Sequence, residues 1–259
     1  MTFPVLSDEE RLQLLAPPTR KVRAVLDTDT YNEIDDQFAV AHAILSPDKI
    51  DLEALYAAPF HNSRSSGPED GMEKSYEEIL RLLEKLGDSS ERPVHKGSRG
   101  YLSEGTMYQD SPAAKDLVDR ALDTAGGPLY VATIGAITNV ASAILMEPEI
   151  IKNIVIVWLG GHALYWPDTN EFNLQQDVHA SRLIFDCGVP VVQIPCKPVT
   201  SHLHTTIPEI EAHVNGKSEI GTYLAEIVKG YSDDHFCWSK VIWDIAATSW
   251  LIKPSWVTT

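Results

Sequence analysis

An apolar run that ends in a cluster of acids is the feature that most restricts how this chain can fold. The run covers Val22–Leu26. Five carboxylates follow within ten residues: Asp27, Asp29, Glu33, Asp35 and Asp36. Apolar residues then resume with helical spacing from Phe38 to Leu45. This pattern predicts a buried strand that leads into a helix, and ligands of open α/β sheets bind at that end of a strand.

Five carboxylates in one turn repel one another, so the sequence also predicts a compensating charge. A hard cation with oxygen ligands is the obvious candidate. The plainer alternative is a solvated acidic loop in which an Asp caps the next helix. That alternative accounts for one or two of these acids, but not for all five beside so apolar a strand.

The composition limits the class of protein. The chain has 259 residues, of which 44% are hydrophobic, so we expect a sizeable core and no bulk disorder. The formal charge is −16, from 37 Asp and Glu residues against 21 Lys and Arg residues. This balance argues against binding to nucleic acid or to an anionic membrane, and it suits a small neutral substrate or a cation.

The cysteines and the N-terminal segment indicate a cytoplasmic protein. The three cysteines show no CxxC spacing, and their odd number cannot pair fully, so we expect reduced thiols. The first 21 residues lack the basic start and apolar segment of a signal peptide. No apolar run approaches the roughly 18 residues of a membrane span.

Strand and helix patterns alternate along the chain. Strands are predicted at Val22–Leu26, Leu52–Ala58, Pro93–Gly97, Leu129–Thr133, Ile150–Leu159 and Val189–Ile194. Helices are predicted within residues 1–20, at Asp35–Leu45, Glu73–Leu86, Ser111–Leu122, Thr138–Met146, Gln175–Asp186 and Asp244–Leu251, and from Ile207 onward, with a loop at Pro59–Gly71. The alternation predicts one α/β domain over residues 1–259, with a mostly parallel, doubly wound, Rossmann-like sheet flanked by helices.

Three later stretches carry polar groups suited to a site at the strand ends. In TIGAITN, Gly135 allows the backbone to approach closely, so that carbonyls can face inward. In NEFN, Glu171 and Asn173 lie on one side of an extended chain, although a surface turn is an equal alternative. Asp244 lies in the apolar segment VIWDIAA, where an Asp is unfavourable unless it is paired, metal-bound or capping a helix.

On these stretches the chain resembles the nucleoside hydrolase family, the inosine–uridine-preferring type of N-ribohydrolase. DTDTYNEIDD resembles the family's DxDxxxDD signature, with a spacer two residues longer. TIGAITN is similar to a TGPLTN-like turn, NEFN followed by Asp177 is similar to AEFN, and Trp243-Asp244 is similar to a C-terminal His-Asp pair. The four matches occur in the family's order and cover about residues 22 to 250. Together they are specific, whereas DxD alone is a weak signal.

The resemblance implies a calcium-dependent enzyme that hydrolyses the N-glycosidic bond of ribonucleosides to free base and ribose. It assigns the calcium ion to the carboxylates of Asp29, Asp36 and Asp244 and to the carbonyl of Ile134. It also makes Asp29 the general base for water, with Asp27 behind the metal ligands. Relatives form dimers or tetramers, so the resemblance implies a homodimer or a homotetramer.

The resemblance further implies a nucleoside pocket. Its ribose contacts are Asp35, Glu171 and Asn173, with Asn62 as a loose candidate for an Asn that follows the family's second strand. Trp243 stands where many relatives have a His that could act as a leaving-group acid. A Trp ring can stack on a base instead, which favours purine nucleosides, although a core position for this ring is an equal alternative.

His162 follows Gly160-Gly161 at a predicted strand end, and we expect its side chain to reach the same pocket.

The chain departs from the family pattern in two further respects. The longer spacer can shift Asp35 and Asp36 relative to Asp29. The chain also stops soon after Asp244, whereas relatives continue for some tens of residues, so we expect a truncated terminus or a rebuilt edge.

Two other functions stay open on the sequence. A magnesium phosphohydrolase of the haloacid-dehalogenase type also begins with DxD after a strand, but it favours Thr or Val where this chain has Tyr31, and it leaves NEFN unexplained. A non-catalytic protein that binds the metal or ribose is the other. Assays of base release and phosphate release distinguish the three.

Overall fold

Six parallel strands form the centre of the computed structural model, which describes residues 2–104 and 107–257. Their order across the sheet is β3-β2-β1-β4-β5-β6. The bounds are β1 (Val22–Thr28), β2 (Ile50–Ala57), β3 (Val94–Lys96), β4 (Leu129–Thr133), β5 (Ile154–Leu159) and β6 (Val191–Ile194). This is the doubly wound order, in which the chain crosses over in opposite directions from β1 and from β4 and leaves a crevice between their carboxyl ends. The predicted fold class is confirmed.

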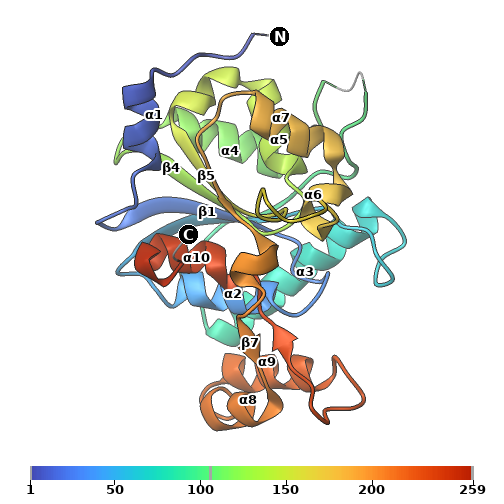
Figure 1. Cartoon of the computed structure of the whole chain (residues 1–259). Helices are drawn as coiled ribbons and strands as arrows, with labels where there is room; N and C mark the ends of the chain where they lie inside the picture. The colour runs from blue at the N-terminus through green and yellow to red at the C-terminus, as the bar shows by residue number, and fades with distance from the viewer. Residues whose placement is uncertain (1, 105–106, 258–259) are drawn as a thin grey trace.

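Helices cover both faces of this sheet (Figure 1). One face carries α1 (Asp8–Leu15), α4 (Pro112–Leu122), α5 (Thr138–Met146) and α7 (Val178–Asp186), and the other carries α2 (Asp36–Ile44), α3 (Pro68–Leu86) and α10 (Ile245–Ile252). Each face has its own apolar cluster, and β1 supplies both, with Val25 on one side and Leu26 on the other. A strand that is buried on both faces has apolar residues on both sides, and this pattern is why the sequence predicts β1.

A smaller part of the chain projects beyond the second face (Figure 1). It holds α8 (Ile207–His213), α9 (Glu219–Lys229) and an antiparallel ribbon of β7 (His204–Thr205) and β8 (Lys240–Val241). Ile34, from the acidic turn, packs into its apolar cluster with Ile210 and Val228. The turn that follows β1 is therefore held by segments from late in the chain. The helices predicted from Ile207 onward are present, but the ribbon was not predicted.

Three predicted boundaries are wrong, each for a local reason. Helix α3 begins at Pro68 inside the predicted loop, because Pro is favoured in the first turn of a helix. Strand β5 begins only at Ile154, because a 3-10 helix, η1, occupies Pro148–Lys152. The predicted Gln175–Asp186 helix is two helices, α6 (Phe172–Gln176) and α7. They separate at Asp177, whose side chain accepts the Ala180 N–H and so caps α7.

The remaining short helices are η2 (Cys196–Thr200) and η3 (Pro254–Trp256). Among the described residues, no helix is both long and apolar enough to cross a membrane.

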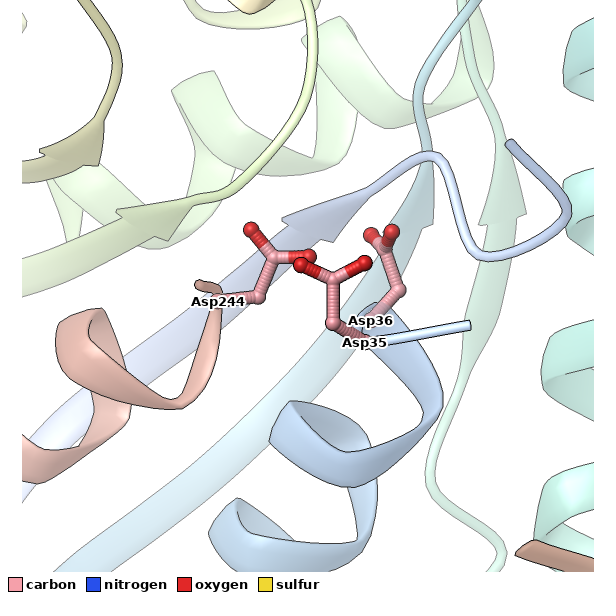
Figure 2. A group of neighbouring side chains, drawn as sticks. All are labelled: Asp35, Asp36 and Asp244. Carbon is pink, nitrogen blue, oxygen red and sulfur yellow. The ribbon is translucent and has the colours of Figure 1, made fainter. Parts of the chain in front are cut away.

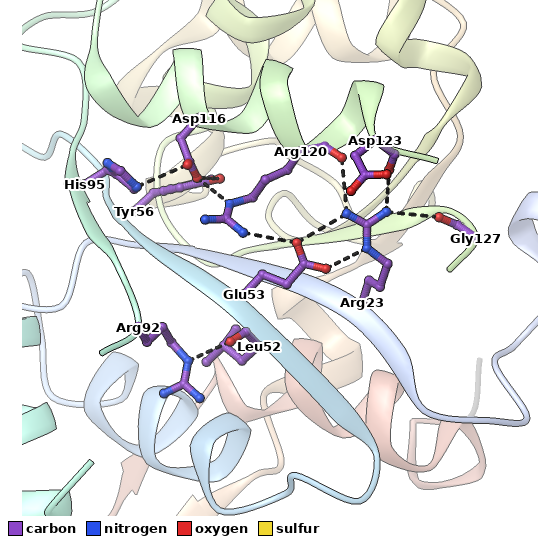
Figure 3. Close-up of polar contacts among 10 residues, drawn as sticks. All are labelled: Arg23, Leu52, Glu53, Tyr56, Arg92, His95, Asp116, Arg120, Asp123 and Gly127. Carbon is purple, nitrogen blue, oxygen red and sulfur yellow. Dashed lines mark hydrogen bonds and ion pairs between the residues drawn. The ribbon is translucent and has the colours of Figure 1, made fainter. Parts of the chain in front are cut away.

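A half-buried ion network ties the sheet to α4 (Figure 3). Glu53 of β2 accepts the Arg23 Nε at 2.6 Å and the Arg120 Nη1 at 3.2 Å. Arg120 also pairs with Asp116 at 2.6 Å, and the Tyr56 hydroxyl donates to the same carboxylate. Figure 3 shows Glu53 between the two guanidinium groups. The network joins β1, β2 and α4.

We expect Glu53→Gln to lower the free energy of unfolding by about 1–3 kcal/mol, because two half-buried guanidinium groups lose their shared counter-charge. For a chain of this size, that lowers the melting temperature by about 2–4 °C per kcal/mol. The matched control is Glu149→Gln, which removes an exposed pair with Lys152 and should change stability little. Equal melting temperatures for the two variants would contradict this role.

Candidate active site

Three carboxylates from opposite ends of the chain meet where α2 and α10 begin (Figure 2). One oxygen each from Asp35, Asp36 and Asp244 lies within 4.8 Å of the others. Asp35 and Asp244 stand at the N-cap positions of their helices, but neither side chain makes a capping hydrogen bond. All three residues are at most 4% exposed. Capping therefore does not account for Asp244, and the acids converge on a common point.

Asp29 is fully buried beside this trio, and neither of its carboxylate oxygens has a hydrogen-bond partner among the described residues. Burial first, and then the charge of Asp36, raises the pKa of Asp29 well above its ordinary value. The backbone at Gly135 comes so close that a Cβ there would lie 2.9 Å from the Asp29 Cγ. The close approach expected of Gly135 is thus made to this carboxylate.

The other acids are also unfavourable as isolated charges. Burial, followed by the charge of Asp35, raises the pKa of Asp36 to about 7, although the Thr28 hydroxyl donates to it at 2.6 Å. Burial and then the charges of Asp35 and Asp36 raise the pKa of Asp244 well above its ordinary value. Buried, mutually repelling carboxylates with orphaned oxygens are a donor set that fits a hard divalent cation.

Lys240 of β8 holds the longer acidic turn in place. Its ammonium group pairs with Glu33 and lies 3.9 Å from the Asp35 Oδ1. The other Asp35 oxygen accepts the Trp243 backbone N–H at 3.0 Å. The extra length of the spacer is therefore absorbed by contacts with the β7–β8 ribbon, and Asp36 remains beside Asp29.

A cavity of about 180 Å³ opens beside the acids. Seven residues singled out from the sequence line it: Asp35, Ile134, His162, Glu171, Asn173, Trp243 and Asp244. Asp29 and Asp36 do not line it and lie in the fully buried layer. Pockets for drug-sized ligands are usually about 300–1,000 Å³, so the enclosed part suits a small unit such as a sugar.

The NEFN stretch is fixed by hydrogen bonds between its side chains and backbone groups at the ends of β4 and β5, and it is not a free surface turn. The Glu171 carboxylate accepts the N–H groups of Gly161, Asn173 and Leu174 at 2.7–3.0 Å. The Asn173 amide donates to the carbonyls of Ile134 and Leu159, at 3.0 Å each. The predicted ligand carbonyl of Ile134 is therefore oriented by Asn173 and keeps one free lone pair.

His162 is 7% exposed and presents a defined donor to the cavity. Its Nδ1 accepts the Lys197 backbone N–H at 3.3 Å, so the ring proton of the neutral form is on Nε2. Nε2 has no hydrogen-bond partner among the described residues. The ring edge-packs on Trp166, which limits its rotation.

Two further residues considered from the sequence do not line the cavity: Asn62, which was expected at the ribose, and Asp27, which was expected only behind the metal ligands. Asn62 is outside the cavity lining, because its amide donates to the Asn32 side chain at 2.6 Å. Asn32 lines the cavity in its place, and its position inside the acidic turn was the only signal for it. The Asp27 carboxylate accepts hydrogen bonds from the Asn139 amide and the Thr133 hydroxyl. Burial raises the pKa of Asp27 to about 7. The residue ties β1 to β4 and α5 and does not reach the cavity.

Further lining residues had been given no role from the sequence. Three of them belong to stretches already singled out, namely Glu33 of the acidic turn and Asn170 and Phe172 of NEFN, and three do not, namely Leu159, Cys196 and Lys197. Cys196, which flanks an apolar run, is 7% exposed in this wall, and burial raises the pKa of its thiol. No spacing in the sequence relates Cys196 to the acids. It reaches the cavity wall because the chain turns into η2 at this residue.

Comparisons with known proteins identify the family of this chain. The sequence profile of the inosine-uridine preferring nucleoside hydrolases matches residues 24–259. The pyrimidine-specific ribonucleoside hydrolase RihA of Escherichia coli strain HS is 26% identical over 254 residues, covering 87% of this chain and 78% of RihA. A purine-preferring ribonucleoside hydrolase from Gardnerella vaginalis has a TM-score of 0.72 at 24% identity, covering 92% of this chain and 82% of the other. A plant nucleoside hydrolase has a TM-score of 0.68 at 21% identity, with coverages of 92% and 80%.

Fold, site and family match together define an enzyme of the nucleoside N-ribohydrolase class. More narrowly, the chain belongs to the inosine–uridine preferring nucleoside hydrolase family. The predicted homodimer or homotetramer and the cytoplasmic location stay predictions.

Proposed function

We propose that this protein hydrolyses the N-glycosidic bond of ribonucleosides to free base and ribose, with Ca²⁺ as its cofactor. The observation that carries the proposal is the orphaned Asp29 carboxylate, which is buried within the charge field of Asp36 and Asp244 at the switch point of the sheet. These three carboxylates and the Ile134 carbonyl would hold the ion. When bound, calcium would lower the pKa of a coordinated water and hold sugar hydroxyls.

The chain's own residues provide the rest of the chemistry. Asp29 would accept the proton of the water that attacks the anomeric carbon, as that carbon gains oxocarbenium character. The carbon–nitrogen bond breaks, and the base departs with the electron pair and takes up a proton. Asp35, which faces Lys240 and the Trp243 N–H, would accept a ribose hydroxyl. His162 would donate through Nε2–H to an acceptor on the substrate.

Trp243 is the residue that bears on the choice of base. It is half-buried in the cavity wall, where its ring can stack on a planar group. A bicyclic purine offers such a ring more contact area than a pyrimidine does. We therefore propose a purine preference, which differs from the pyrimidine specificity in the name of RihA.

A base-release assay tests this function. Inosine, adenosine, guanosine and uridine are incubated with the enzyme in calcium and in chelator, and ribose is measured. We expect release in calcium, fastest for a purine nucleoside, and little release in chelator. A phosphomonoester in parallel should release no phosphate. No base release from any nucleoside, despite bound calcium, would contradict hydrolysis and favour a non-catalytic binding protein.

A further inference from the structure

A second cavity, of about 520 Å³, lies on the other side of the acidic turn. Tyr31 and Glu33 of the turn, Gln37 of α2, Arg64 and residues of α3 and α9 line it. Glu33 lines both cavities, so the two share a wall. None of the groups proposed for the metal lines this second cavity.

One of the two guanidinium groups in this cavity has no direct ion pair among the described residues. The Glu33 carboxylate is paired with Lys240. The Glu78 carboxylate is paired with Arg81 and also accepts the Tyr223 hydroxyl at 2.5 Å. Among the described residues, Arg64 has no ion pair with a carboxylate. Arg64 is therefore a cation without a carboxylate partner in a protein whose net charge is −16.

Arg64 is held in place without being neutralised. Its Nη1 donates to the Glu33 backbone carbonyl at 2.9 Å. Its guanidinium group lies over the Tyr31 ring, 4.6 Å from the centroid. A guanidinium group has five N–H donors in a planar fork that matches an oxyanion, and these contacts leave most of them available. Because the side chain is already ordered, little of its rotational freedom is lost on binding.

Gln37 gives an independent sign of a ligand. The residue is 3% exposed and lines the cavity, and its Oε1 has no hydrogen-bond partner among the described residues. Buried amides are nearly always satisfied, so this one lacks a partner that a ligand can supply. The amide oxygen and nitrogen can exchange places by a flip, so the side chain can donate to an oxyanion or accept from a hydroxyl.

We propose that this second cavity binds the phosphate group of a small molecule, with Arg64 as the charge partner and Gln37 as a hydrogen-bond partner. The cavity is larger than a phosphate group. The space between Tyr31, Tyr223 and Tyr231 can hold the organic part of the same molecule. The phosphate belongs either to the substrate, reaching past Glu33 from the first cavity, or to a separate metabolite. The inference goes beyond the proposed function and does not depend on hydrolysis.

The test is calorimetric titration of the full chain, in chelator, with inorganic phosphate and with a ribonucleoside 5′-monophosphate. We expect the wild type to bind both probes, and Arg64→Gln and Gln37→Glu each to weaken binding at least tenfold. The matched control is Arg182→Gln, whose side chain is 82% exposed on α7 and which should bind like the wild type. Melting curves of each variant show that it is folded.

The two probes also separate the two sources of phosphate. A monophosphate that binds at least tenfold tighter than both phosphate and the parent nucleoside assigns the phosphate to the substrate. Equal affinity for monophosphate and free phosphate assigns it to a separate ligand, and either result supports the site. No binding of either probe by the wild type, or equal binding by wild type and both variants, would overturn it. Because no turnover is measured, such a failure leaves the proposed hydrolysis standing.

Discussion

Replacing Asp29 with Asn should lower kcat/KM for nucleoside hydrolysis by at least about 10³-fold while the protein stays folded. A general base alone contributes about 10²–10⁴-fold, and this carboxylate is also proposed to hold the metal. The matched control is Asp186→Asn on α7, an exposed acid paired only with exposed Arg182, which should leave kcat/KM unchanged. Activity of Asp29→Asn within tenfold of the wild type would remove Asp29 from both roles.

The same variant has a signature that does not depend on activity. In chelator above pH 7, Asp29→Asn should melt at a higher temperature than the wild type, because it removes a buried charge that has no partner. In saturating calcium the order should reverse, because the wild type gains the energy of binding the ion. A residue that is merely structural would lower the melting temperature under both conditions.

Adding calcium should raise the melting temperature more at pH 8 than at pH 5.5. Without the ion, the folded-state pKa of Asp36 is about 7, well above its ordinary 3.8, and the pKa values of Asp29 and Asp244 are raised in the same direction. The folded chain therefore keeps protons that the unfolded chain has lost, and its stability falls as pH rises from about 4 to about 7. Calcium binds the deprotonated carboxylates, so it restores most stability above that window.

The size of this effect follows from linkage. A ligand at 100 times its Kd stabilises the folded state by about 2.7 kcal/mol, which for this chain length corresponds to a shift of roughly 5–10 °C. Scanning calorimetry in calcium, in magnesium and in chelator at both pH values measures it, and the chelated enzyme should lose nearly all activity. A shift of the same size at both pH values would show that these carboxylates do not hold the ion.

The strands and the acidic turn could be predicted because their signals are local. Strand β1 is buried on both faces, so four of its first five residues are apolar, and the acids that follow it stand out against this run. The alternation of strands and helices was enough to predict the doubly wound sheet. The start of β5 was predicted too early, because Ile150 and Ile151 of the preceding 3-10 helix extend the apolar pattern of the strand backwards.

The tertiary structure alone decided how the site is assembled. The resemblance to a family implied that Asp244 would join Asp29 and Asp36 at a metal, since no local pattern relates residues so far apart in the chain. Only the structure shows that Asp35 shares that point with Asp36 and Asp244. No sequence pattern indicated that Lys240 would lie beside the acidic turn or that Asn62 would lie outside the first cavity. The second cavity had no sequence signal either. Lys240 and the second cavity depend on how the β7–β8 ribbon and α9 pack against the acidic turn, and Asn62 is held by Asn32 of that turn. These contacts join distant segments and are not set by the order of residues within any one of them.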